Sequence, residues 1–318
     1  MKVARAASVK SLVVFVALSY ALAWLVAAPL WVAGGIQAVS GPVFTAIGIL
    51  MMYTPTVAAL VACKLDRKPL RSTLGLGFGH HAGRTVLTVI LVVLAVALVA
   101  LAGLLTSALL GTYTFDIVHL NGARQILEQQ LAAAGQPMPD IPLHLLVPII
   151  IAQSFTVGTL ISSLAALGEE IGWRGYLTPA LAERLGAPLA TLAIGVIWGC
   201  WHAPLLLLGY NYPTIPGWQR LVWMSVFCTI VAAVLGWGRA RTNSVIPAAI
   251  GHGAVNAGMA TLALMLGSSP TLDTANATVM GWAGWPLALI IAGVFVTVLW
   301  PKASPEGGRV LSTPQDVT

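Results

Sequence analysis

The sequence predicts an all-α, polytopic membrane protein with about eight transmembrane helices and with both termini in the cytoplasm. The 318 residues are 58% hydrophobic and only 8% charged, whereas a soluble domain carries about 25% charged residues. The mean hydropathy of +0.89 points the same way. The apolar residues gather into runs of about 20, the length that crosses a bilayer, near 11–33, 44–63, 85–110, 146–167, 187–208, 221–238, 244–266 and 281–300.

The first run follows Lys2, Arg5 and Lys10, as the apolar part of a signal peptide would. It is longer than that part usually is, and more apolar runs follow it, so we expect an uncleaved first helix. The connection 111–145 is the one long loop, and "ARQILEQQLAAAG" within it predicts a short surface helix. We expect one membrane-embedded domain over 1–300, with a motif core at 165–260, and a loose cytoplasmic tail at 301–318.

Lys and Arg residues assign the orientation, because they are enriched in cytoplasmic loops. With the N-terminus in the cytoplasm and eight spans, the outer side receives only Arg124 and Arg220. The formal charge of +6 is therefore a signature of topology and predicts no nucleic-acid partner. The cytoplasmic side receives Lys2, Arg5, Lys10, Lys64, Arg67, Lys68, Arg71, Arg84, Arg174, Arg184, Arg239, Arg241, Lys302 and Arg309.

A few polar side chains lie within the predicted spans, where an ionisable group costs about 2.5–3.5 kcal/mol and by default marks a functional site. They are Glu169, Glu170, Arg174, His202, His252 and Asn256. We expect the fourth helix to continue through 171–185, with a bend at Pro179, to a turn near Leu185, Gly186 and Ala187. Glu169 and His202 then lie about 24 Å from this turn, at one level. His252 approaches from the next cytoplasmic turn, so three spans converge on one polar pocket.

Helical spacing divides the tasks among these residues. Glu170 and Arg174 form an i, i+4 pair with the acid first, the favourable order for an ion pair. Glu169 is rotated by about 100° from Glu170 and is left free for chemistry. Each residue also has a structural interpretation: a helix-end ion pair for Glu170 and Arg174, and interhelical hydrogen bonds for the others. The combination at one level favours a functional site.

Two chemistries fit this set of residues. A buried Glu169 beside His202 can take a proton from water, while His252 and Asn256 donate hydrogen bonds to the oxyanion that forms at a carbonyl. This is amide hydrolysis without a covalent intermediate. Alternatively, Glu169, His202 and His252 ligate one zinc ion that activates the water. The sequence leaves the cofactor open between one zinc ion and none.

The same residues resemble the motifs of a known family, the CAAX prenyl protease and bacteriocin-processing (CPBP or Abi) intramembrane proteases. "EEIGWRG" matches the E-E-x-x-x-R motif, "WGCWH" the aromatic-x-x-x-H motif and "HGAVN" the H-x-x-x-N motif. The match covers roughly 169–256. The second motif usually has Phe where this chain has Trp198, which keeps an aromatic ring but alters the pocket.

The resemblance implies a role for each matching residue. Glu169 and His202 look like the pair that activates water, and His252 and Asn256 like the pair that stabilises the oxyanion. Glu170 and Arg174, with Trp198, look like structural support. Relatives of this kind are often called metal-dependent, but their residues also suit a metal-free glutamate protease. Eukaryotic members cut the last three residues from prenylated CAAX proteins, and many bacterial members are linked to peptide processing or bacteriocin immunity.

Together these observations predict a multi-pass protein of the cell membrane, with membrane lipid and a peptide or protein substrate as its partners. We expect an intramembrane endopeptidase whose site opens towards the cytoplasm and whose substrate is a membrane-associated or lipidated peptide. The main alternative is a non-catalytic membrane adaptor, chaperone or bacteriocin-immunity protein that uses the same pocket for binding. A transporter is a weaker alternative, because it favours inverted repeats and the polar groups here cluster in one half of the chain.

Overall fold

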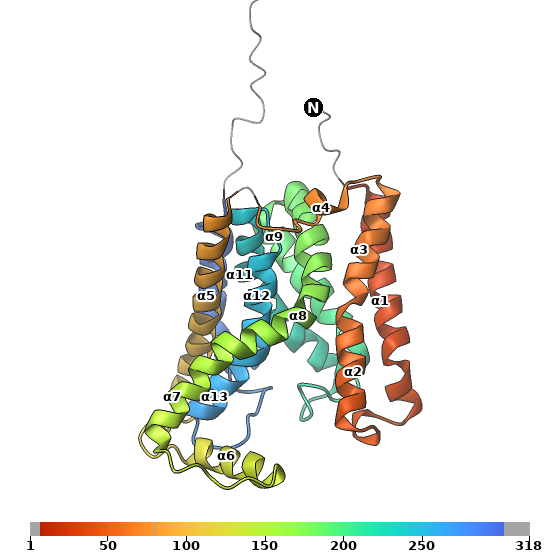
Figure 1. Cartoon of the computed structure of the whole chain (residues 1–318). Helices are drawn as coiled ribbons and strands as arrows, with labels where there is room; N and C mark the ends of the chain where they lie inside the picture. Colours follow the sequence, from red (N-terminus) through yellow and green to blue (C-terminus); the bar gives the residue numbers. More distant parts are fainter. Residues whose placement is uncertain (1–6, 80, 302–318) are drawn as a thin grey trace, which may run out of the picture.

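The computed structural model describes residues 7–79 and 81–301, and these residues form helices and loops without any named strand. The predicted tail, apart from residue 301, lies outside the described residues. The helices run side by side as one bundle (Figure 1). Within the described ranges, six helical segments are long and apolar enough to cross a membrane, and a shorter apolar segment lies at Trp282–Thr297. The protein is therefore an all-α, multi-pass integral membrane protein, as the sequence predicts.

The predicted apolar runs correspond in order to the helices of the bundle. The short surface helix predicted in the long loop is α6 (Asn121–Ala133). The helices that match these runs are α1 (Val9–Val32), α2 (Gly41–Met52) with α3 (Thr54–Leu65), α5 (Ala82–Leu109), α7 (Leu143–Gln153) with α8 (Thr159–Glu170), α9 (Thr178–Trp201), α11 (Gly217–Thr242), α12 (Ile246–Ala254) with α13 (Ala260–Leu266), and α14 (Trp285–Thr297).

One of the six segments, Leu143–Trp201, is 59 residues long and supplies two of the predicted spans. Its backbone leaves the helical region at Gly186, with φ 74° and ψ 165°. Positive φ is readily available only to glycine. The chain turns back there, which brings Trp198 within hydrogen-bonding distance of Glu169. The turn lies where the sequence predicts it. A π-helical segment, Ile171–Leu177, ends just before Pro179, where the sequence predicts a bend.

The two ends of the bundle differ in charge and in structure. The first, called here the basic end, holds α4 (Leu70–Thr73), the connecting residues 66–79, the Gly186 turn and the turn 243–245. The second, called the loop end, holds α6 and the connections 33–40, 207–216 and 267–284 (Figure 1). Arg184, Arg239 and Arg241 lie at the basic end with the Lys and Arg residues of 64–84. Arg174, which the sequence analysis counted on the cytoplasmic side and also placed within the spans, is fully buried inside the bundle.

The helices α9 and α11 pack closely because α9 presents small residues to its neighbour. An added Cβ at Gly195 would lie 2.5 Å from Thr229 Cα, and one at Gly199 would lie 2.5 Å from Ser225 Cα. Glycines spaced by four residues let helix backbones approach in membranes, where packing rather than water exclusion holds helices together. This contact positions the end of α9, which carries Trp198, against α11.

We therefore expect Gly195→Ala to destabilise the protein by about 1–3 kcal/mol, because the new methyl group must displace the α11 backbone. Thermal unfolding of the purified protein in detergent measures the effect. Gly293→Ala on α14 is the matched control, since no atom lies within 4 Å of its added Cβ. Equal unfolding temperatures for the two variants would contradict the close packing of α9 and α11.

Candidate active site

A cavity of about 480 Å³ lies inside the bundle, and four of the six polar residues singled out from the sequence meet at its wall. Glu169 comes from the end of α8, and His202 is the C-cap residue that directly follows α9. His252 lies on α12, and Asn256 lies one turn further along in the π-helical segment Val255–Met259. All four side chains line this one cavity. The predicted convergence of three spans on one pocket is therefore present.

The carboxylate of Glu169 is held by two indole groups. Trp198 Nε1–H donates to Glu169 Oε2 at 2.6 Å, and Trp173 Nε1–H donates to the same oxygen at 3.3 Å. The side chain is only 2% exposed. A buried carboxylate needs such donors, because burial without hydrogen bonds strongly disfavours the charge. The other oxygen, Oε1, has no hydrogen-bond partner among the described residues and remains available at the cavity wall.

The π-helical segment Ile171–Leu177 places Trp173 and Arg174 directly after the two glutamates. Single π-helical turns within α-helices are often found at functional sites. The carbonyl of Gly168 before the segment accepts a 2.5 Å hydrogen bond from Thr56, and the carbonyl of Trp173 accepts one from Thr178 at 2.9 Å. An added Cβ at Gly172 would lie 2.4 Å from Pro55 Cβ. Glycine at this position thus lets the segment pack directly against α3.

The ring of His202 has a defined tautomer. Its Nδ1 lies 2.9 Å from the carbonyl oxygen of Trp198. A carbonyl can only accept a hydrogen bond, so Nδ1 carries the proton and Nε2 of the neutral ring carries a lone pair. The edge of the ring also packs against Trp201 in a T-shaped contact, with centroids 4.8 Å apart. His202 is therefore fixed on one side and can act as an acceptor on the other.

Glu170 and Arg174 form the predicted ion pair, but Glu170 also contacts His252. Glu170 Oε1 accepts a hydrogen bond from Arg174 Nη1 at 2.8 Å and lies 2.9 Å from His252 Nδ1. Glu170 and Arg174 are fully buried. A carboxylate on Nδ1 fixes the orientation of the imidazole and balances its charge when both nitrogens are protonated, as in catalytic triads. In that state Nε2 of His252 is a hydrogen-bond donor.

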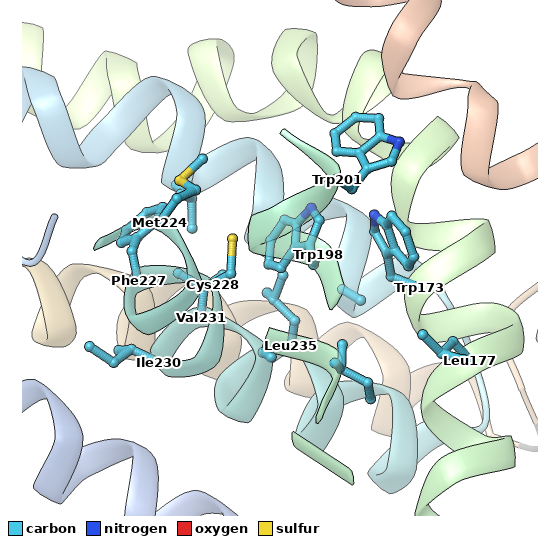
Figure 2. Packing of buried hydrophobic residues seen from close by; sticks show 14 of the residues in the cluster. Trp173, Leu177, Trp198, Trp201, Met224, Phe227, Cys228, Ile230, Val231 and Leu235 are labelled. Carbon is cyan, nitrogen blue, oxygen red and sulfur yellow. The ribbon is translucent and has the colours of Figure 1, made fainter. Parts of the chain in front are cut away.

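Trp198 connects the two halves of the site. The guanidinium of Arg174 stacks over its ring at 4.1 Å, its indole N–H holds Glu169, and its carbonyl holds His202. Figure 2 shows Trp198 between Trp173 and Trp201 on one side and Met224, Phe227 and Cys228 of α11 on the other. The sequence analysis gave Trp198 a supporting role and a part in the shape of the pocket, so its hydrogen bond to Glu169 is a further finding.

Sequence reasoning missed Trp173 and Trp201. Trp173 follows Glu169 by four residues, as Arg174 follows Glu170, so the same helical spacing could have revealed it. Trp201 precedes His202 and donates from Nε1 to Thr54 Oγ1 at 3.2 Å, which anchors the end of α9 on α3. The rings of Trp173 and Trp201 make an edge contact with centroids 5.9 Å apart. These residues form the wall behind Glu169 and His202.

The geometry does not suit the zinc alternative. Among the described residues, no group of three His, Cys, Asp or Glu side chains is arranged to hold a metal ion. Glu169, His202 and His252 therefore line one cavity without forming a ligand set.

The cavity does not extend in the expected direction. Its wall continues from Glu169 to Tyr210 and Asn211 in one connection of the loop end and to Leu272 and Thr274 in another. The sequence interpretation expected an opening towards the end of the bundle that carries most Lys and Arg residues. The reason for the difference is that His202 ends α9, and the connection to α11 begins within a few residues of it.

Comparison with known proteins identifies the same region of the chain. Residues 151–258 match the family model described as type II CAAX prenyl endopeptidase Rce1-like. A 106-residue segment, 32% of this chain, is 30% identical to CAAX prenyl protease 2 of Methanococcus maripaludis. The match spans 39% of that relative's length, so it covers the motif region and leaves most of the relative unmatched.

The matched region contains Glu169, Glu170, Arg174, His202, His252 and Asn256. In this region, the chain is therefore similar to the CAAX prenyl endopeptidases that its three motifs resemble.

Proposed function

We propose that this protein is an intramembrane endopeptidase that hydrolyses a peptide bond with a water molecule activated by Glu169 and His202. One observation carries the proposal. Glu169, His202 and His252 are each fixed by a hydrogen bond on the side away from the cavity, through Oε2, Nδ1 and Nδ1 respectively. Their remaining polar atoms have no partner among the described residues, and all three side chains line the cavity. Anchored groups with free polar atoms are arranged for reaction rather than for helix packing.

In the proposed reaction, a water molecule lies between Glu169 Oε1 and His202 Nε2. Glu169 accepts one of its protons as the oxygen attacks the peptide carbonyl. His202, whose Nε2 carries a lone pair, accepts a hydrogen bond from the second proton and orients the water. The carbon becomes tetrahedral and its oxygen becomes negative. Glu169 then passes the proton to the leaving amine, which breaks the C–N bond and returns the carboxylate.

His252 and Asn256 stabilise the negative oxygen in this proposal. Asn256 is exposed at the cavity wall, and its amide has no hydrogen-bond partner among the described residues. His252 donates from Nε2 when its ring is protonated, and Glu170 balances that charge from the opposite side. Removing a single donor from such a site lowers the rate by about 10²–10³-fold. Glu170 and Arg174 act as positioning residues, since neither lines the cavity.

We expect Glu169→Gln to abolish cleavage, since it removes the base and leaves a side chain of almost the same shape. General bases contribute about 10²–10⁴-fold to such reactions. The measurement compares new peptide N-termini in membranes from cells that express the wild type or the variant at matched levels. Termini that occur only with the wild type identify substrates. Identical termini, with a variant that inserts and folds normally, would favour the adaptor, chaperone or immunity alternative.

Trp198→Phe tests how Glu169 is held. The change keeps an aromatic ring and removes the 2.6 Å donor. A hydrogen bond to a charged group contributes about 1.5–3 kcal/mol, so we expect kcat to fall by about 10–100-fold with little change in KM. Trp173→Phe is the matched control, because its hydrogen bond to the same oxygen is longer. Cleavage of a substrate peptide found in the N-terminus comparison supplies the rates. A larger loss in Trp173→Phe than in Trp198→Phe would contradict this assignment.

A further inference from the structure

The cavity is distributed unevenly along the bundle, and its lining favours the loop end. On α5, which runs from the basic end to the loop end, the lining residues Ala100 and Leu104 lie in the last third of the helix. On α11, which runs the opposite way, the lining residues Met224, Phe227 and Cys228 lie in the first half. On both helices, which run in opposite directions, the lining residues lie in the part nearer the loop end. The cavity therefore extends from the site towards the loop end.

The exposure of the lining residues indicates that the mouth of the cavity is on the same side. Nearly all of the lining residues are buried or half-buried. The exposed ones are Tyr210, Asn256 and Ala260. Tyr210 belongs to a connection of the loop end, and Asn256 and Ala260 lie beyond His252 on the part of the chain that runs towards that end. The exposed part of the lining therefore lies on the loop-end side of His252.

The basic end is closed by packed side chains and by a loop. Each residue of α11 from Ile230 to Arg239 is buried, and Figure 2 shows Leu235 and Leu177 on the far side of Trp198 from Met224. Residues 74–79 then cover this end. Val245 N–H donates to Gly75 O at 3.0 Å, and Ser244 Oγ donates to Gly77 O at 2.5 Å. No lining residue of the cavity comes from this closing layer.

The charge distribution places these ends relative to the membrane. Cytoplasmic loops carry the excess of Lys and Arg, and the basic end carries them in this protein. The loop end has Arg124 and Arg220. Arg220 is used internally, since its guanidinium donates to the carbonyls of Ile215, Leu206 and Leu207. The loop end, with the mouth of the cavity, is therefore extracytoplasmic.

The lining also indicates what enters. Five of the eight methionines of the chain line this cavity: Met51, Met52, Met224, Met259 and Met280. Methionine is flexible and polarizable, and surfaces rich in it bind apolar segments of varied shape. Neither Lys nor Arg contributes to the lining, and Glu169 supplies its only carboxylate. The cavity therefore suits an apolar stretch of polypeptide better than a charged one.

Resting on the function proposed above, we propose that the substrate is an apolar polypeptide segment presented at the extracytoplasmic face, and that it enters between Tyr210 and Asn256. The segment must reach the outer side of the membrane before it is cut. Its delivery therefore requires an earlier step, either export of the polypeptide or its insertion into the membrane. The peptide bond to be cleaved lies at the depth of Glu169, below the membrane surface.

Thiol labelling tests the direction of access without any need for cleavage. Tyr210→Cys and Met224→Cys, one at the mouth and one inside the cavity, are made in the full chain with Cys63, Cys200 and Cys228 replaced by Ala. Lys64→Cys at the basic end is the matched control. We expect a membrane-impermeant, charged thiol reagent to label the Tyr210→Cys and Met224→Cys variants in right-side-out vesicles. In inside-out vesicles, the same reagent should not label them. The control should show the reverse.

Labelling of Cys at 210 and 224 from the cytoplasmic side alone would overturn the proposal. If the chain without native cysteines does not fold, the wild-type background serves, and the labelling of the parent chain, to which the cavity-lining Cys228 can contribute, is subtracted. The result is independent of the proposed function: a protein that labels as expected but cleaves nothing would refute the hydrolase and leave the direction of access intact.

The substrate class is tested with right-side-out vesicles and peptides that carry an impermeant tag. We expect an apolar peptide added outside to be cut by the wild type and to survive with Glu169→Gln. Placing Lys in the middle of the apolar stretch should abolish cleavage, because the lining offers no partner for the charge. Cleavage of the apolar peptide only when it is enclosed inside the vesicles would overturn the proposal, and so would equal cleavage of the Lys-containing peptide.

Discussion

The buried ion pair between Glu170 and Arg174 is the interaction on which the rest of the site depends. Glu170 orients His252 through the same oxygen that accepts from Arg174. Arg174 stacks on Trp198, which in turn holds Glu169. Breaking a buried pair by removing one partner costs about 3–5 kcal/mol, because the other charge is left uncompensated. Because separating the two charges is so costly, the pair stays together inside the bundle. The arrangement that balances these charges is also the one that positions His252 and Trp198.

Much of this arrangement could be predicted from local spacing. The pairing of Glu170 with Arg174 and the turn at Gly186 follow from helical geometry and from glycine, and the apolar runs predict the spans. The hydrogen bond between His252 and Glu170 joins residues 82 positions apart, and it depends on how α12 packs against α8. Trp198 could be recognised as aromatic but not as the donor to Glu169, because its rotamer is set by neighbours on other helices.

The direction of the cavity was the largest difference between expectation and structure. The sequence places the motifs at similar distances from the basic end, and that distance suggested access from there. It does not show that α11 is buried from Ile230 to Arg239 or that residues 74–79 cover the end of the bundle. A charge count identifies which side a loop lies on, whereas the packing of small and large side chains decides which side is open. These are separate properties of the chain.

The chain reversal at Gly186 separates the carboxylate groups of the site from its imidazole and amide groups along the sequence. Both glutamates precede it along the chain, and His202, His252 and Asn256 follow it. The turn itself is exposed, and an added Cβ there would meet no atom within 4 Å. A chain cut at this point would separate into an acidic fragment and an imidazole-bearing fragment, each incomplete. The two could regain a whole site only by reassociating in the bilayer, which makes this turn a natural boundary for a split, complementing enzyme.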